Sequence, residues 1–150
     1  MSKVDFYILE SSSKQKAWHY ACLWLEQIVV ENKRVYINME SSEDANALDL
    51  LMWTYRDDSF LPHCIYTAKE EFPAAIQIGV SNTPPLSTEM THDILLNFAQ
   101  HLPSFHSHFS QIVEIVSADT LAQEWARLRY KQYREQGYNM NTIKLKADAL

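Results

Sequence analysis

The chain has 150 residues, a hydrophobic fraction of 47% and a formal net charge of −6, which fits one domain with a sizeable core. No run of about 18 apolar residues occurs and the first apolar stretch is too short for a signal peptide, so we expect a cytoplasmic protein without a membrane span. The acidic charge disfavours non-specific nucleic-acid binding by the whole surface.

Strands and helices alternate in the first part of the chain. Residues 4–9 are β-branched and aromatic, which favours a buried strand, and Ser12 or Ser13 can cap the helix that follows. Residues 33–39 predict a second strand. Residues 41–55 predict a second helix, because a serine cap and acidic first-turn residues precede an apolar stripe.

The second part of the chain continues this alternation. We expect short buried strands at 64–68, 74–80, 93–99 and 110–117, and one helical turn within 103–109. A long helix is expected from about Ala118 to Gln136, with Gly137 as the residue that ends it. Residues 138–150 are expected to form an extended or disordered tail, which leaves residues 1–137 as the single domain.

Continuous apolar strands between amphipathic helices indicate an α/β sandwich with a mostly parallel sheet. Such a fold raises the hypothesis of a nucleotide-binding enzyme, but the chain has only two glycines, Gly79 and Gly137. Dinucleotide and P-loop sites need several, because the backbone must approach a phosphate closely. We therefore expect no nucleotide-binding motif and no cofactor.

Other residues that could carry chemistry favour structural roles. His92, His101, His106 and His108 lie in turn-like sequence without the accompanying ligands of a zinc site. His63 and Cys64 are adjacent on an expected strand, so their side chains would point to opposite faces and could not form a dyad. Cys22 and Cys64 lack metal-binding spacing and are expected to be buried thiols. We expect no catalytic site and no metal site.

Two segments have the composition of docking surfaces. In the first, Trp53 ends a helix, and Phe60 and Leu61 lie in the loop that follows. Loops usually carry polar residues, so these apolar side chains either cap the domain's own core or form a patch for a partner protein.

The second segment is the basic stretch near the end of the chain. Residues 1–120 hold 7 basic and 16 acidic residues, a net of −9, whereas residues 121–150 hold 6 basic and 3 acidic residues, a net of +3. Most of this positive charge belongs to the expected helix at 118–136. The asymmetry indicates a local partner for that helix.

On this helix, Leu121, Trp125 and Leu128 are expected to pack on the sheet. Another face gathers Gln123, Arg127, Tyr130, Lys131 and Arg134. That face is either a solvated surface or a site for an acidic peptide with an aromatic end, or for a phosphate backbone.

The sequence resembles the chi subunit of the bacterial DNA polymerase III holoenzyme. The resemblance covers most of the chain and is carried by "FYIL" (6–9), "KRVYI" (33–37), "ALDLLMW" (47–53), "SFLPH" (59–63), "AAIQIG" (74–79), "DILLNF" (93–98) and the spaced block within 126–142. It implies a Rossmann-like three-layer sandwich without a nucleotide site. It also implies a non-catalytic accessory subunit of a DNA-directed DNA polymerase complex in replication, which pairs with the psi subunit of the clamp loader and binds the acidic, Phe-ended tail of single-stranded DNA-binding protein.

Carried over residue by residue, the resemblance implies two interfaces. The psi interface would comprise Trp53, Phe60, Leu61, Pro62 and His63, and the tail-binding pocket would comprise Gln123, Arg127, Tyr130, Lys131 and Arg134. Some relatives have a lysine where this chain has Gln123, so the pocket would be weaker or would rely on Arg134. A repair helicase is left open as a further partner of the first surface. The alternative function is direct nucleic-acid binding by the basic helix, which the −9 charge of residues 1–120 disfavours.

Overall fold

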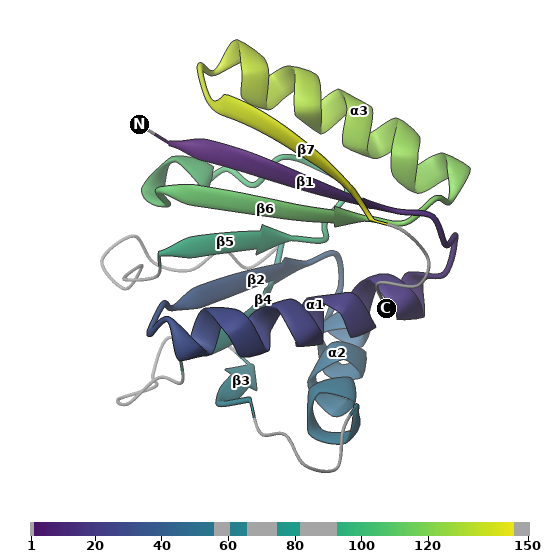
Figure 1. The fold of residues 1–150 in the computed structure, drawn as a ribbon, viewed down its shortest axis with the longest axis vertical. Coiled ribbons are helices and arrows are strands. Elements are labelled where there is room, and N and C mark those ends of the chain that lie inside the picture. Colours follow the sequence, from purple (N-terminus) through teal and green to yellow (C-terminus); the bar gives the residue numbers. More distant parts are fainter. Residues whose placement is uncertain (1, 56–60, 66–74, 82–92, 146–150) are drawn as a thin grey trace.

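The computed structural model describes residues 2–55, 61–65, 75–81 and 93–145 (Figure 1). Its strands are β1 (Lys3–Leu9), β2 (Val35–Met39), β3 (His63–Ile65), β4 (Ile76–Val80), β5 (Ile94–Asn97), β6 (Gln111–Val116) and β7 (Asn139–Leu145). Its helices are α1 (Lys14–Val30), α2 (Ser42–Thr54), α3 (Thr120–Glu135) and a short 3-10 turn, η2 (His106–His108).

The seven strands form one sheet in the order β3–β4–β2–β5–β6–β1–β7. All pairings within the described residues are parallel. The single-domain α/β, Rossmann-like fold with a parallel sheet is therefore confirmed. Within the described residues, none of the helices is both long and apolar enough to span a bilayer.

Helices cover both faces of the sheet, which gives three layers (Figure 1). On one face, α1 and α2 pack over a core that includes Leu25, Leu48 and Ile37. On the other face, α3 and η2 pack over a second core that includes Phe6 and Tyr133. The strands contribute side chains to both cores, because successive side chains of a strand point to opposite faces of the sheet.

Side-chain caps begin each of the three α-helices. Ser13 accepts a hydrogen bond from the backbone N–H of Lys16 at 3.3 Å, and Ser41 caps α2 in the same way. Asp119 caps α3 by accepting from the backbone N–H of Ala122 at 3.0 Å. These contacts satisfy amide groups that have no partner inside the helix, and they fix where each helix starts.

Gly137 ends α3, as expected, with a φ of +91°. Its backbone N–H donates to the carbonyl of Arg134 at 3.1 Å, and the N–H of Tyr138 donates to the carbonyl of Tyr133 at 3.3 Å. This pair of bonds is the Schellman motif, which requires a left-handed residue that glycine adopts without strain. Gly79, on β4, has a different role, because a Cβ there would overlap the ring of Tyr36.

The expected domain end at residue 137 is wrong. Residues 139–145 form β7, which pairs in parallel with β1 over its whole length. The extended conformation was expected, but not its place in the sheet, because this strand is largely exposed and lacks an apolar run. Residues 146–150 of the expected tail lie outside the described residues.

The expected packing face of α3 is also wrong. Leu121 is 49% exposed and Leu128 is 63% exposed, whereas Ala126, Arg129 and Tyr133 are buried. The reason is a carboxylate on the sheet: Glu114 of β6 is 1% exposed and binds the inward side chains of α3. A helical wheel ranks faces by hydrophobicity and cannot include a charged partner contributed by another element.

Candidate functional site

A pocket of about 510 Å³ lies between α3 and the strands β1 and β7. It is lined by all five residues expected to bind an acidic tail: Gln123, Arg127, Tyr130, Lys131 and Arg134. The sheet and the inner side of the helix add residues that were not expected: Phe6, Ile8, Val116, Ala126, Thr142 and Lys144. The structure thus brings the predicted residues together in one concave surface.

The geometry of the crossover explains this pocket. α3 connects β6 to β7, and β1 lies between these two strands in the sheet. One face of the helix packs on the sheet through Ala126 and Tyr133. The neighbouring face, which carries residues at i, i+4 and i+7 from Arg127, then overhangs the β1–β7 edge. Figure 1 shows α3 lying along this edge.

The rim of the pocket is cationic. The side chains of Arg127, Lys131, Arg134 and Lys144 are exposed, and no carboxylate occurs among the described residues that line it. Guanidinium groups bind carboxylates through two parallel hydrogen bonds, and lysines bind them as point charges. The rim therefore suits a ligand with several negative charges.

The floor of the pocket is apolar and aromatic. Phe6 is 2% exposed, and its ring centroid lies 5.4 Å from that of Tyr130. The guanidinium carbon of Arg134 lies 6.0 Å from the Tyr130 ring centroid, which extends the aromatic wall towards the cationic rim. An apolar or aromatic side chain of a ligand could pack here while neighbouring carboxylates bind the rim.

Arg129 belongs to the same basic stretch but not to this pocket. Its guanidinium binds the Glu114 carboxylate with an Nη2–Oε1 distance of 2.8 Å, and its Nη1 donates to the carbonyl of Gln100 at 2.8 Å. The hydroxyl of Tyr133 donates to Glu114 at 2.9 Å, and the side-chain amide of Asn97 donates to it at 3.1 Å. Burial, together with the adjacent Glu114 charge, raises the pKa of Tyr133 well above its usual value. This network fixes α3 to the sheet.

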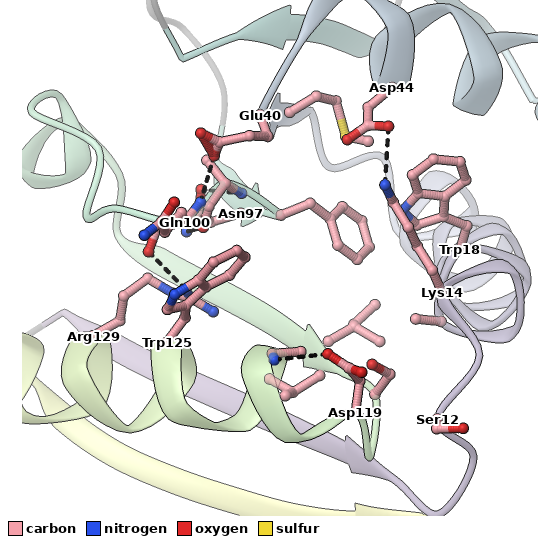
Figure 2. Close-up of a pocket in the computed structure, with 18 residues that line it drawn as sticks. Ser12, Lys14, Trp18, Glu40, Asp44, Asn97, Gln100, Asp119, Trp125 and Arg129 are labelled. Atoms are coloured by element: carbon pink, nitrogen blue, oxygen red, sulfur yellow. Dashed lines mark hydrogen bonds and ion pairs between the residues drawn. The ribbon is translucent and has the colours of Figure 1, made fainter.

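A second pocket of about 510 Å³ lies on the other side of α3, at the carboxyl ends of β2, β5 and β6 (Figure 2). Ligands of open α/β sheets usually bind at such ends. Here Trp18 of α1 and Trp125 of α3 contribute to the walls, and Asn97 and Val116 are among the strand residues.

The charged groups of this second pocket are paired within the chain. Lys14 binds Asp44 at 3.0 Å, Glu40 accepts from the backbone N–H of Gln100 at 2.7 Å, and Asp119 caps α3. Figure 2 shows these contacts around the opening. Three carboxylates would oppose a phosphate group, and the helix N-termini that could bind one are capped by the chain's own side chains.

The surface expected to bind psi is only partly exposed. Trp53 is 55% exposed, and Leu50, one helical turn before it, is 64% exposed. Pro62 is half-buried, whereas Phe60 lies outside the described residues. Leu50 was not among the expected residues, although its spacing from Trp53 on the helix could have identified it.

Leu61 and His63 do not belong to an exposed surface. Leu61 is 1% exposed and packs in the core between the sheet and α1 and α2, so it is not available for direct contact with a partner. His63 is also buried; its Nε2 lies 3.3 Å from Asp49, and its ring centroid lies 4.8 Å from that of Trp53. His63 therefore packs against the exposed indole of Trp53, whereas Leu61 belongs to the core.

The surroundings of Cys22 and His106 indicate structural roles and not catalytic ones. Cys22 is buried and free, and burial raises its pKa to about 12, as expected of an inert thiol. His106 lies 2.6 Å from the hydroxyl of Tyr138, and His92 lies outside the described residues. Within the part of the chain that the structure describes, no group of three or more potential ligands could hold a metal ion.

Comparison with known proteins identifies close similarity to one family. A family model described as "DNA polymerase III chi subunit, HolC" matches residues 1–141. A relative from Haemophilus influenzae is 32% identical, with 92% of this chain and 94% of the relative covered, and one from Pseudomonas aeruginosa is 29% identical, with 97% and 98% covered. A relative from Escherichia coli is 28% identical, with 95% and 97% covered. All three are named DNA polymerase III subunit chi.

Two solved structures have a similar fold. Domain 2 of the DEAD-box helicase Mss116p, bound to an RNA duplex, matches with a TM-score of 0.66 at 12% identity, over 95% of this chain and 64% of that one. T4 UvsW matches with a TM-score of 0.65 at 7% identity, over 96% of this chain and 41% of that one. At this identity the likeness concerns the fold alone.

Proposed function

The chain belongs to the DNA polymerase III chi subunit family, whose members are accessory subunits in replication, and from this premise we propose that it is a non-catalytic adaptor. One surface would bind the acidic C-terminal tail of single-stranded DNA-binding protein, and another would bind a psi subunit that connects the chain to the clamp loader. A cytoplasmic location is part of the same proposal, since replication takes place there in bacteria.

The pocket beside α3 is the observation that carries the tail-binding half of this proposal. It combines four cations and an apolar floor in a chain whose net charge is −6. An acidic peptide that ends in Phe has the complementary chemistry, because its carboxylates match the rim and its ring matches the Phe6–Tyr130 floor. Each exposed charge pair contributes about 0–1 kcal/mol, so the affinity should be modest, about micromolar, and sensitive to salt.

The α2 surface supports the psi-binding half. Leu50 and Trp53 expose large apolar side chains on one side of the helix. Exposed aromatic residues with neighbouring apolar groups are common centres of protein interfaces. The substitution Trp53→Ala, which removes such a centre, should lower the affinity for a psi subunit encoded in the same genome about 30-fold, which corresponds to about 2 kcal/mol. Co-purification of the two proteins should be weakened accordingly. Leu128→Ala, which removes an exposed apolar side chain elsewhere, is the matched control.

The tail-binding half is tested by titrating a fluorescent acidic peptide ending in Phe against the protein at low and high salt. Arg127→Ala should weaken binding up to about fivefold at low salt, and Tyr130→Ala by about tenfold at both salt concentrations, because the first removes a screened charge and the second a packing surface. Lys33→Ala, at a partly exposed lysine outside the pocket, should bind like the wild type. Binding that neither pocket substitution alters would contradict this location.

Direct nucleic-acid binding is tested by the same kind of titration, with a labelled single-stranded oligonucleotide in place of the peptide. The adaptor proposal expects no measurable binding at moderate salt, because the rest of the surface repels phosphate. Oligonucleotide binding that Arg127→Ala abolishes, combined with failure to bind the peptide, would favour the nucleic-acid alternative instead.

A further inference from the structure

The edge strand β7 contributes side chains to the tail-binding pocket in a fixed pattern. Its register with β1 pairs Thr142 with Phe6 and Lys144 with Ile8. These four residues all line the pocket. Register partners in neighbouring strands share a face of the sheet, and residues two apart on a strand also share a face. The backbone pairing therefore directs the Lys144 side chain towards the α3 side of the sheet.

The residues on either side of this pair, Asn141 and Leu145, show the same alternation. Asn141 pairs with Asp5 in the register, and its side-chain amide donates to the Asp5 carboxylate at 3.3 Å. Leu145 pairs with Leu9, and both pack in the core on the α1 side. A shift of β7 by one residue would move Asn141 and Leu145 to the α3 side of the sheet and Lys144 to the opposite side. The orientation of Lys144 is thus tied to two independent contacts on the opposite face.

The direction of α3 determines which end of the pocket Lys144 occupies. The helix starts just after the carboxyl end of β6 and runs antiparallel to the strands (Figure 1). Its first pocket residue, Gln123, therefore lies over the carboxyl ends of the strands, and Arg134 lies towards their amino ends. Lys144 is the penultimate residue of β7, so it lies at the Gln123 end.

Gln123 leaves that end of the pocket without a cation from the helix. Along the pocket face, α3 presents Gln123 first and then Arg127, Lys131 and Arg134. Lys144 makes no ion pair with another described residue, and its side chain is exposed. Among the described residues that line the pocket, Lys144 is the one cation that comes from the sheet. The other cations come from α3.

We propose that Lys144 binds a carboxylate of the acidic ligand at the Gln123 end of the pocket, so that the ligand is held between α3 and the edge strand β7. This inference rests on the proposed tail-binding function and adds to it a positioning role for the strand. A ligand that contacts cations on two elements must lie across the groove rather than along the helix alone. The apolar floor between the two sets of cations then receives its apolar side chain.

The test compares charge-removing substitutions in the same peptide titration. Lys144→Gln should weaken binding by about two- to fivefold at low salt and by much less at high salt, as for one screened charge pair. Lys16→Gln, which removes an exposed lysine from α1 outside this pocket, is the matched control for net charge. Lys144→Arg should keep the wild-type affinity.

A compensating substitution tests the placement itself. Adding Gln123→Lys to Lys144→Gln should restore most of the lost affinity, because it returns a cation to the same end of the pocket. Adding Gln136→Lys, beyond the other end of α3, should not. Rescue by both substitutions equally would mean that only net charge matters and would overturn the assignment.

The outcomes separate this inference from the proposed function. If the wild type binds and Arg127→Ala weakens binding while Lys144→Gln does not, the role of Lys144 is overturned and the tail-binding function stands. If the wild type does not bind the peptide at low salt, the tail-binding function fails and the inference fails with it. Far-UV circular dichroism and denaturation of each variant verify that the fold is intact.

Discussion

The two sides of α3 use the same kind of residue for different purposes. Arg127 and Arg134 face a solvent-exposed pocket without an acidic partner in its described lining. Arg129, two positions after Arg127, is 7% exposed and binds Glu114. Helical spacing places Arg127 and Arg129 on opposite sides of α3, because residues two apart on a helix do not share a face. What each side contacts is decided by the sheet, which presents an apolar floor to the pocket side and the Glu114 carboxylate to Arg129.

This contrast indicates how a short basic stretch can both fold and bind. The inward arginine has its charge neutralised and its donors satisfied, so it contributes to the position of the helix. The outward arginines keep their charge accessible to a partner, and their Coulomb interactions are screened by salt. Substitutions on the inner side should therefore change stability, and substitutions on the outer side should change binding.

The largest difference is expected between Arg129→Ala and Arg127→Ala. Removing Arg129 leaves the Glu114 carboxylate buried and unpaired, so the free energy of unfolding should fall by about 3–5 kcal/mol. Removing Arg127 from the exposed side should change it by less than about 0.5 kcal/mol. Urea denaturation followed by fluorescence measures both. The double variant Glu114→Gln with Arg129→Met should recover part of the lost stability, because no buried charge is then left unpaired. An equal loss of stability in Arg129→Ala and Arg127→Ala would contradict the distinction between the two sides of the helix.

An intermediate effect is expected for the tyrosine hydroxyls. Tyr133→Phe removes the donor that binds Glu114 at 2.9 Å, and a buried hydrogen bond to a charged group contributes about 1.5–3 kcal/mol. Tyr130→Phe keeps the ring that packs on Phe6, so its unfolding free energy should stay within about 0.5 kcal/mol of the wild type. If Tyr130→Phe proved as destabilising as Tyr133→Phe, the pocket wall would be part of the structural network.

The smallest effect concerns pH. Burial lowers the pKa of His106, whose ring packs edge-on against Tyr133 and Tyr138 below the C-terminal end of α3. The unfolded chain then binds a proton more readily than the folded one, so stability is complete above about pH 6.5 and falls as the pH drops below it. His106→Gln should flatten this part of the stability curve measured by urea denaturation. His108→Gln, in the same turn but exposed, is the control, and a steep curve in His106→Gln would assign the effect to another group.

Several features were accessible from sequence because they depend on local chemistry. The caps at Ser13 and Ser41 and the glycine at residue 137 act on backbone groups within a few residues of themselves. Buried parallel strands have continuous apolar sequences. The basic face of α3 was predictable because helical spacing alone places Arg127, Lys131 and Arg134 near one another.

Other features depended on contacts between distant segments. Leu61 was expected in a docking loop but lies in the core, because it comes two residues before β3, which is part of the sheet. β7 has an exposed, polar sequence and becomes a strand by pairing with β1, which is more than 130 residues away. No pattern within β7 itself indicated that Lys144 would lie in the pocket.

The sequence by itself determined the parallel α/β fold, the helix boundaries to within a few residues and the set of α3 residues that share a basic face, because each depends on periodicity or on near neighbours. Only the tertiary structure decided which side of α3 packs inward and which cations meet in the pocket. Both depend on Glu114 of β6 and on the register of β7, and a buried charge pair or an edge-strand pairing has no local sequence signal.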